Sequence, residues 1–172
     1  MNNVHCDSLI PCPKDLNFLY DTNYIRRAGV IPYMEYNGNT YILLGYSNEK
    51  KPVWADLGGR AEENETTLET ALREYGEESR YVLPLDLSKI SKILITGRPG
   101  SIAPDQVHLI INIDPTSYNI NINSAFQLTI PKTQYEDEMS LLKWIPYNDF
   151  MIMKGLSGSM EYVRSLLKSL LT

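Results

Sequence analysis

Hydrophobic and polar positions alternate over several short runs of this chain, which is the pattern typical of strands in a sheet. Five runs have this character: 24–36, 40–46, 89–96, 106–113 and 140–146. Between the first two, Asn37-Gly38-Asn39 predicts a tight hairpin, because Asn-Gly readily adopts the turn that joins antiparallel strands. The segments without this alternation are predicted to be loops at 47–59 and 98–105, and a loop or irregular strand at 114–131.

A period near 3.6 residues replaces the alternation in two segments, 65–81 and 159–172. The first begins with a capping box, in which Thr66 can cap the helix and Glu69 completes the box. Its apolar positions are expected to form one buried face: Leu68, Ala71, Leu72 and Tyr75. The second segment predicts an amphipathic helix packed on the sheet, with an apolar side made of Val163, Leu166, Leu167 and Leu170.

Length and composition predict one soluble globular domain. The chain has 172 residues, with 43% hydrophobic and 22% charged, which is enough for a full core. Its net charge of -5 excludes a bulk electrostatic attraction to nucleic acid or to an anionic membrane. Residues 23–172 are expected to form the domain, and residues 1–22, which have no clear periodicity, an N-terminal arm on its surface.

The sequence favours a cytoplasmic protein with no membrane partner. No apolar run reaches the roughly 18 residues of a membrane span, and the first residues lack the charged-then-apolar order of a signal peptide. The two cysteines, Cys6 and Cys12, match no zinc-binding spacing, so a reducing compartment is expected. Nothing in the pattern indicates an oligomeric state.

Three glutamates, Glu74, Glu77 and Glu78, lie side by side on another face of the helix predicted at 65–81. Like charges at these spacings cost about 0.2–0.5 kcal/mol per pair, and carboxylates near a helix C-terminus also oppose the helix dipole. A local arrangement that costs stability is often a functional site. Clustered carboxylate oxygens suit a hard divalent cation such as Mg²⁺ or Mn²⁺, although an acidic solvated helix face is the common alternative.

The residues before this helix favour the functional interpretation. Leu57-Gly58-Gly59-Arg60 supplies a flexible loop whose backbone carbonyl can approach a metal ion closely. Glu65 and Arg73 are spaced so that they can pair and hold this loop against the helix. The pattern therefore combines a carboxylate cluster with a means of fixing a loop beside it.

Residues 59–81, GRAEENETTLETALREYGEESRY, resemble the Nudix box, G-x(5)-E-x(7)-R-E-U-x-E-E-x-G-U, where U is aliphatic. Six positions match: Gly59, Glu65, Arg73, Glu74, Glu77 and Glu78. Two features differ, because Arg80 replaces the final glycine and Tyr75 and Tyr81 occupy the aliphatic positions. Over residues 24–170, the chain is similar to the Nudix hydrolase family.

This resemblance implies an α/β fold, namely an α/β/α sandwich around a mixed β-sheet in which the box forms a loop–helix–loop metal site. It also implies a hydrolase that uses Mg²⁺ or Mn²⁺ to cleave the diphosphate linkage of a nucleoside diphosphate joined to another moiety. The implied metal ligands are Glu74 and Glu78, assisted by Glu77 and the Gly59 carbonyl. Arg73 would belong to the same catalytic group, and both Arg73 and Glu65 would support it structurally.

The general base of such an enzyme is expected among Glu136, Asp137 and Glu138, which precede the strand predicted at 140–146. In the family that the chain resembles, an acid at this place often enters the site. Glu138 is the candidate, with an exposed acidic turn as the alternative. His108 lies in an apolar run and is expected to be a satisfied core or pocket residue.

Substrate recognition calls for aromatic rings that stack and cations that bind phosphate. Trp54 and Tyr33 are the candidates for stacking, and Arg27 and Arg98 are the candidates for phosphate binding. Each has an ordinary alternative, because a tryptophan is more often part of a core and Arg26-Arg27 can merely flank a strand.

Three classes of function are compatible with these features: a diphosphate hydrolase, a non-catalytic Nudix-fold module that binds a nucleotide or a partner, and a scaffold with an acidic helix. The intact glutamates favour the enzyme, because a pure binder has no need of their repulsion. Its partner would be a nucleotide-type small molecule, such as a dinucleoside polyphosphate, ADP-ribose or a nucleotide sugar, or a capped RNA 5′ end. For RNA, the acidic net charge would be offset by a basic groove made of Arg26, Arg27, Lys50, Lys51 and Arg98.

Arg80 has two interpretations. If the helix ends in a left-handed turn, a side chain there is strained, and glycine would raise stability by a fraction of about 1 kcal/mol. In the other interpretation, Arg80 is a cation that reduces the repulsion among the glutamates or binds substrate phosphate, and glycine would weaken substrate binding. The strain interpretation is preferred.

Overall fold

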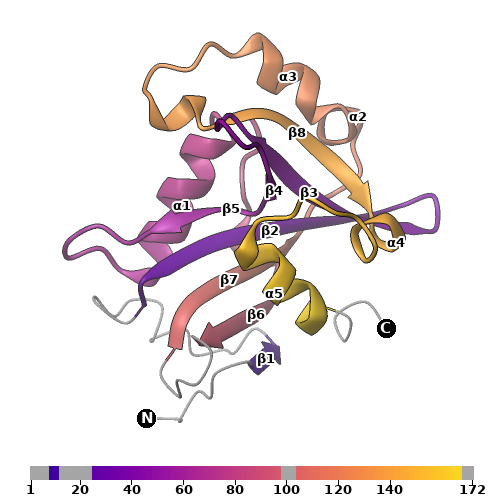
Figure 1. The fold of residues 1–172 in the computed structure, drawn as a ribbon. Coiled ribbons are helices and arrows are strands. Elements are labelled where there is room, and N and C mark those ends of the chain that lie inside the picture. The colour runs from indigo at the N-terminus through magenta and orange to yellow at the C-terminus, as the bar shows by residue number, and fades with distance from the viewer. Residues whose placement is uncertain (1–7, 12–24, 98–103, 168–172) are drawn as a thin grey trace.

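The computed structural model describes residues 8–11, 25–97 and 104–167, in which one sheet is flanked by helices (Figure 1). The strands are β1 (Ser8–Pro11), β2 (Arg27–Tyr36), β3 (Asn39–Ser47), β4 (Trp54–Ala55), β5 (Leu57–Arg60), β6 (Ile90–Gly97), β7 (Pro104–Asn112) and β8 (Met139–Pro146). The helices are α1 (Thr67–Glu78), α2 (Ser117–Ile120), α3 (Ile122–Leu128), α4 (Tyr147–Phe150) and α5 (Gly158–Leu167), with 3₁₀ turns η2 (Leu87–Lys89) and η3 (Tyr135–Asp137). None of the helices in this described part is both long and apolar enough to cross a membrane.

The sheet is mixed and does not close on itself. Its strands lie in the order β1-β6-β7-β2-β3-β4, while β5 pairs with β2 and β8 pairs with β3. β2 runs parallel to β7 and antiparallel to both β3 and β5. The central strand β2 thus connects the main sheet to β5, which carries the glycine pair at the start of the predicted box.

Two hydrophobic cores lie on opposite faces of the sheet. In β2, Val30 is buried in a core that α1 and α3 cover, whereas the next residue, Ile31, is buried in a core that α4 and α5 cover. The same alternation separates Leu43 from Leu44 in β3. Because successive side chains of a strand point to opposite faces, this period of two confirms the expected α/β/α sandwich.

The hairpin predicted at Asn37-Gly38 is present between β2 and β3. Asn37 has φ 50° and Gly38 has φ 76°, and the flanking Tyr36 and Asn39 are paired directly across the turn. Positive φ values at both central residues match the right-handed twist of the two strands, which is why Asn-Gly is favoured there.

The capping box predicted for α1 is also present. The Glu69 N–H donates to the Thr66 hydroxyl at 3.1 Å, and the Thr66 N–H donates to the Glu69 carboxylate at 2.8 Å. The buried face, however, differs from the expected apolar stripe. Ala71 and Tyr75 are buried but Leu68 and Leu72 are only partly so, while the polar positions Thr67, Thr70 and Glu78 are buried. The helix packs against β2 and β5, so its polar side is turned towards their backbone.

Two segments that were predicted to be loops contain regular structure. Residues 114–131 form α2 and α3 instead of a loop or irregular strand, because Ile122 and Phe126 are one turn apart and both enter the core. Residues 47–59 contain the short strands β4 and β5, which the polar composition concealed. In the stretch expected to be an arm, β1 adds an edge strand that pairs with β6.

The end of α1 bears on the two interpretations of Arg80. Arg80 has φ 51° and Tyr81 has φ 57°, so the left-handed turn exists. The Arg80 N–H donates to Glu77 O and the Tyr81 N–H to Gly76 O, which is the Schellman pattern of a helix end. The Arg80 guanidinium, however, binds four backbone carbonyls rather than the helix glutamates. Its removal would cost these bonds, so the gain in stability expected from glycine stays untested and is opposed by their loss.

Replacing Gly58 by alanine should lower the free energy of unfolding by about 1–3 kcal/mol, because it overpacks a closed contact. A methyl group there would lie 2.5 Å from the Gly29 Cα and 2.7 Å from the Ala28 carbonyl oxygen, both of them backbone atoms. Chemical denaturation measures the change. Gly158→Ala is the control: its methyl group meets nothing within 4 Å, so it should not destabilise. Equal stability of the two variants would contradict the close β2–β5 contact.

Candidate functional site

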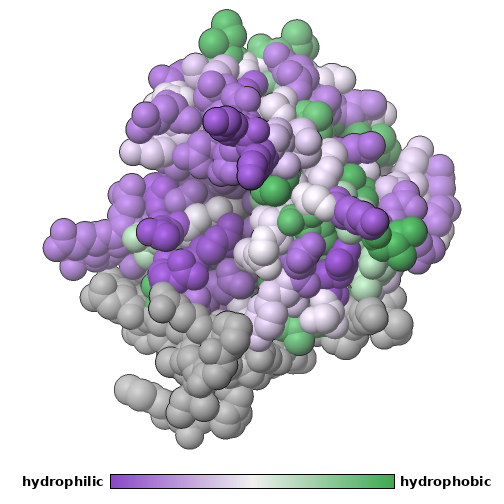
Figure 2. Space-filling view, in the orientation of Figure 1, coloured by the Kyte–Doolittle hydropathy of each residue, from purple (hydrophilic) through white to green (hydrophobic). Residues whose placement is uncertain are grey.

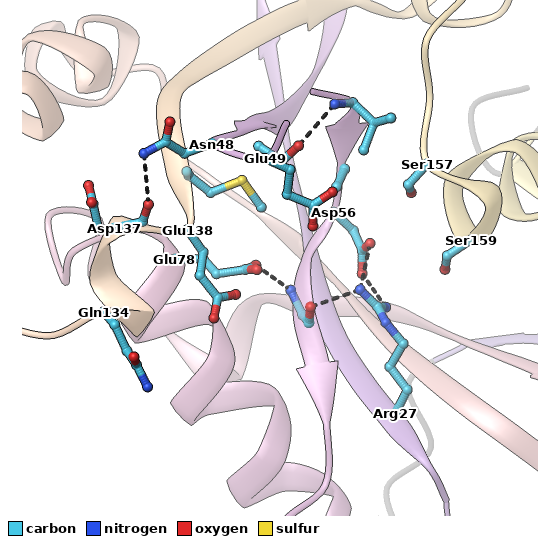
Figure 3. Close-up of a pocket in the computed structure, with 15 residues that line it drawn as sticks. Arg27, Asn48, Glu49, Asp56, Glu78, Gln134, Asp137, Glu138, Ser157 and Ser159 are labelled. Atoms are coloured by element: carbon cyan, nitrogen blue, oxygen red, sulfur yellow. Dashed lines mark hydrogen bonds and ion pairs between the residues drawn. The ribbon is translucent and has the colours of Figure 1, made fainter. Parts of the chain in front are cut away.

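A pocket of about 670 Å³ opens between α1, the η3–β8 segment and the start of α5 (Figure 3). The surface on the side shown in Figure 2 is mainly hydrophilic. Most of the described residues that line the pocket are polar or charged: Arg27, Ser47, Asn48, Glu49, Asp56, Glu78, Gln134, Asp137, Glu138, Ser157 and Ser159. The pocket thus brings together residues from distant parts of the chain. Among the described lining residues are Glu78 and Glu138 of the predicted site, but not Gly59, Glu74 or Glu77.

The glycine pair of β5 forms the floor beneath two glutamates of α1. The Gly58 N–H donates to Glu78 Oε2 at 2.7 Å. Gly59 lies so close to Glu74 that a Cβ added at Gly59 would overlap the Glu74 carboxylate. The predicted proximity of the glycine loop to the carboxylates is therefore present, and at Gly59 it depends on the absence of a side chain.

Arg73 in α1 binds the loop that precedes this helix and also two glutamates of the helix itself. Its Nε donates to Glu65 at 2.7 Å, and its Nη2 donates to the Arg60 carbonyl at 2.9 Å. Its Nη1 donates to Glu74 at 2.9 Å and to Glu77 at 3.2 Å. The pairing that the sequence suggested for Glu65 and Arg73 is present, and the same guanidinium also neutralises part of the charge of the helix glutamates.

This network shifts the pKa values of Arg73 and Glu65 so that the charged form of each is favoured. The hydrogen bond from Arg73 to Glu65 is the main reason that the pKa of Arg73 is raised. Burial alone would raise the pKa of Glu65, but its hydrogen bonds, led by the one from Arg73, outweigh burial and lower it. Both side chains therefore stay ionised and hold the loop at 60–65 against α1.

The pKa values of three other glutamates in or near the pocket are raised, which favours their neutral form. Burial, with Asp56 and Glu74 nearby, raises the pKa of Glu78 well above its ordinary value. Burial also raises the pKa of Glu74, against the effect of Arg73, and the charges of Glu77 and Glu138 add to it. Burial and the neighbouring Glu77 likewise raise the pKa of Glu138. Acidic groups that resist ionisation in this way would be stabilised by an added cation.

The donor set fits a hard divalent cation in its chemistry, because the carboxylates of Glu78 and Glu138 line the pocket and that of Glu74 lies beside Gly59. In the described part of the chain, no three His, Cys, Asp or Glu side chains are gathered closely enough to hold a metal ion by themselves. Mg²⁺ is commonly bound by only one or two carboxylates, with waters and phosphate oxygens completing its octahedron.

Arg27, predicted to bind phosphate, is instead bound to protein groups at the back of the pocket. Its guanidinium donates to both oxygens of Asp56, at 2.6 and 3.0 Å, and to the Gly58 carbonyl at 2.8 Å. His108 is fully buried, but the satisfied histidine that was expected is present at one ring nitrogen only, since its Nε2 lies 2.8 Å from Asp56. Among the described atoms, its Nδ1 has no hydrogen-bond partner.

Asp56 is the part of this site that sequence reasoning missed. Burial would raise its pKa, but Arg27 and His108 outweigh burial and hold the pKa of Asp56 far below its usual range. The residue lies in a stretch that looks like a polar loop, and its partners are far away in the chain. The one available signal was its position two residues before Gly58.

The two aromatic residues predicted to stack on the substrate lie away from the pocket. Trp54 is partly buried in β4, with its ring centroid 4.8 Å from that of Tyr46, and it packs with Tyr33 against the core beneath α5. Neither Trp54 nor Tyr33 is among the described residues that line the pocket. Arg98 lies outside the described residues, and Arg26 forms an exposed ion pair with Asp105.

Comparison with known proteins identifies the fold. No protein-family model matches the chain, and no curated protein matches it in sequence. Its structure resembles the NUDIX domain of Shewanella oneidensis NrtR complexed with ADP ribose, with a TM-score of 0.53 and 16% identity over 92% of this chain and 94% of that one. It also resembles a C. elegans Ap4A hydrolase binary complex, with a TM-score of 0.52 and 16% identity over 86% and 97% of the two chains.

A Nudix hydrolase from M. smegmatis, RenU, is a third structure of this kind, with a TM-score of 0.51 and 16% identity over 85% of this chain and 88% of that one. At such identities the likeness establishes the fold. The chain therefore has the α/β/α architecture of these Nudix structures, as the resemblance at residues 59–81 implied.

In metal-free protein, Glu78→Gln should raise the thermal midpoint at neutral pH. Because the pKa of Glu78 is higher in the folded protein than its ordinary 4.5, the stability that this group contributes is present below that value. It is lost as the pH rises through the folded pKa, and glutamine removes this loss. The melting curves of variant and wild type should thus converge at acid pH and separate towards neutral pH.

Glu63→Gln, which makes the same charge change at an exposed position of the preceding loop, should follow the wild type throughout. A Glu78→Gln protein that is less stable than the wild type at neutral pH would contradict the burial of an uncompensated charge at this position.

Asp56→Asn should lower the free energy of unfolding by about 3–5 kcal/mol, because it leaves the Arg27 charge without its buried partner. Asp114→Asn breaks the exposed Lys89–Asp114 pair and should change stability by no more than about 1 kcal/mol. Denaturant titration of both variants measures the difference. Similar small losses in the two would show that Asp56 is not the structural centre of the pocket.

Proposed function

We propose that this protein is a Nudix-type hydrolase that cleaves the diphosphate linkage of a nucleoside diphosphate joined to another moiety, with Mg²⁺ or Mn²⁺ as its cofactor. One observation carries the proposal. Glu78, which lines a polar pocket, accepts the Gly58 N–H, and Glu74 lies against Gly59 on the same helix; the pKa of each glutamate is raised. Such a cluster repels an anionic substrate unless a cation lies between them.

The residues that would hold the cation are Glu74 and Glu78, with Glu77 and the Gly59 carbonyl assisting. When bound, a divalent cation supplies positive charge that neutralises phosphate oxygens and makes a water molecule more acidic. The protein's own contribution is to fix these groups before the substrate arrives. Arg73 does so by binding Glu74, Glu77 and the loop carbonyl of Arg60 at the same time.

Glu138 is proposed as the general base. It lines the pocket with Glu78, and burial near Glu77 raises the pKa of Glu138, which brings it closer to the range in which a base works at neutral pH (Figure 3). Glu136 is buried, and its carboxylate accepts the Lys132 N–H at 3.0 Å. Asp137 also lines the pocket, but its side chain is 55% exposed and lies 3.6 Å from the Arg80 guanidinium. Glu138 is therefore our choice among the three acids that precede β8.

The substrate side of the pocket is polar. Asn48, Gln134, Ser157 and Ser159 present amide and hydroxyl groups that can bind ribose hydroxyls and phosphate oxygens. Two of the similar structures carry names of nucleotide compounds, Ap4A and ADP ribose, each of which contains a diphosphate linkage. Dinucleoside polyphosphates and ADP-ribose are therefore the first substrates to test, followed by nucleotide sugars and capped RNA.

A second candidate is a module that binds a nucleotide without cleaving it. The NUDIX domain of NrtR is described as complexed with ADP ribose, which supports a nucleotide-binding role as the second candidate. The two candidates differ in one measurable respect, since only the hydrolase releases two phosphate-bearing products.

Purified protein should hydrolyse at least one of these compounds with Mg²⁺ or Mn²⁺, and chromatography of the products should show cleavage within the diphosphate. Glu78→Gln should lower kcat by orders of magnitude while the fold is retained, because a charge is removed from the cation site. Glu138→Gln should lower kcat by about 10²- to 10⁴-fold, the usual contribution of general base catalysis.

Glu63→Gln is the matched control and should keep wild-type activity, since its side chain is exposed outside the pocket. Near-normal activity of Glu78→Gln at saturating Mg²⁺ would reject α1 as the cation site. Binding of ADP-ribose by the wild type without any turnover would instead favour the binding module.

A further inference from the structure

Arg80 occupies the position at which the Nudix box has glycine, and its conformation is costly for a residue with a side chain. Its φ of 51° lies in the left-handed region, which glycine adopts without strain and other residues rarely do. Such strain persists only where the surroundings impose it, and it is concentrated at functional sites. The contacts of the Arg80 side chain explain what holds it there.

The Arg80 side chain, only 9% exposed, extends from the end of α1 to the segment that runs from α3 to β8. Its Nη1 donates to the carbonyls of Phe126 and Thr129 at 3.1 and 3.0 Å. Its Nε donates to the Glu136 carbonyl at 3.0 Å and its Nη2 to the Met139 carbonyl at 3.3 Å. The guanidinium also lies 3.9 Å from the centre of the Phe126 ring.

Two of these carbonyls flank Glu138 in the sequence, at Glu136 and Met139. On its other side, the same turn is held by Asn48, whose backbone N–H donates to the Glu138 carbonyl at 2.7 Å. The Asn48 side chain donates to the Asp137 carbonyl at 3.3 Å. The backbone that carries Glu138 is thus clamped between the end of α1 and the end of β3.

We propose that Arg80 is a positioning residue that fixes Glu138 at the pocket, in register with the glutamates of α1. This inference rests on the proposed function in one respect, the role of Glu138 as general base. A guanidinium suits the task because it offers five N–H donors in a rigid plane and keeps its charge at any physiological pH. A lysine would keep the charge but could not serve four carbonyls from a fixed geometry.

The test compares Arg80→Lys and Arg80→Gly with a matched control, Arg164→Lys. Arg164 in α5 also binds carbonyls, those of Phe150 and Met153 at 3.4 and 2.7 Å, and it does not line the pocket. Hydrogen exchange of the amides at 132–139 is measured in metal-free protein, which needs no activity. Turnover of a hydrolysed nucleotide is then measured for each variant, alone and combined with Glu138→Gln.

Both Arg80 variants should exchange faster at 132–139 than the wild type, whereas Arg164→Lys should not. Their kcat should fall by about 10²-fold, the scale of a displacement of roughly 1 Å at a catalytic group, with a smaller change in KM. In the Glu138→Gln background the same substitutions should have almost no further effect on kcat, because they act through Glu138.

Unchanged exchange at 132–139 in both Arg80 variants would overturn the proposal. So would a loss of kcat that persists in full in the Glu138→Gln background, since Arg80 would then act through another group. Arg80→Lys guards against a failure of Arg80→Gly to fold, because the lysine keeps the charge and most of the side chain. If the wild type hydrolyses none of the nucleotides, the proposed function fails, and the exchange experiment alone decides whether Arg80 holds the turn.

Discussion

The close approach of α1 to the backbone of β5 is the constraint on which the rest of the site depends. Gly58 donates its N–H to Glu78, and Gly59 leaves no space for a side chain beside Glu74. At the same time, Gly58 faces Gly29 of β2 with almost no clearance. Because α1, β5 and β2 approach one another so closely, the carboxylates of Glu74 and Glu78 lie where water is partly excluded.

Burial of these carboxylates requires positive charge nearby, and the structure supplies it from two directions. On the outer side, Arg73 binds Glu65, Glu74 and Glu77. On the inner side, Arg27 lies between Asp56 and the Gly58 carbonyl, where its charge is largely balanced by Asp56. The compensation is incomplete, because the pKa of Glu78 remains raised well above its ordinary value. An added cation would remove this imbalance, and for that reason the geometry favours a metal-dependent reaction over a purely structural acidic face.

The pocket has two walls: the first is formed by α1 and β5, and the second belongs to neither of them. It is the turn at η3, which carries Asp137 and Glu138 and reaches the first wall through the side chain of Arg80. In the proposed function, Glu138 acts together with glutamates on another segment, so the separation of the two segments must be held constant. Backbone carbonyls bound by one rigid guanidinium meet that requirement. Arg80 thus adopts a left-handed φ that glycine would adopt without strain, and its side chain connects the end of α1 to the turn at η3.

The sequence by itself determined the elements whose causes are local. The Asn37-Gly38 hairpin, the capping box at Thr66 and the alternation of the central strands all depend on residues within a few positions of one another, and all three are present. Of the clustered glutamates, Glu74 and Glu78 lie beside the glycine pair, as their spacing suggested. What only the tertiary structure decided was the set of partners from distant segments. Asp56 binds Arg27 across 29 positions, and Arg80 reaches Met139 across 59. Such pairs are set by sheet register and by the packing of loops on helices, and neither is encoded in the periodicity of a short segment.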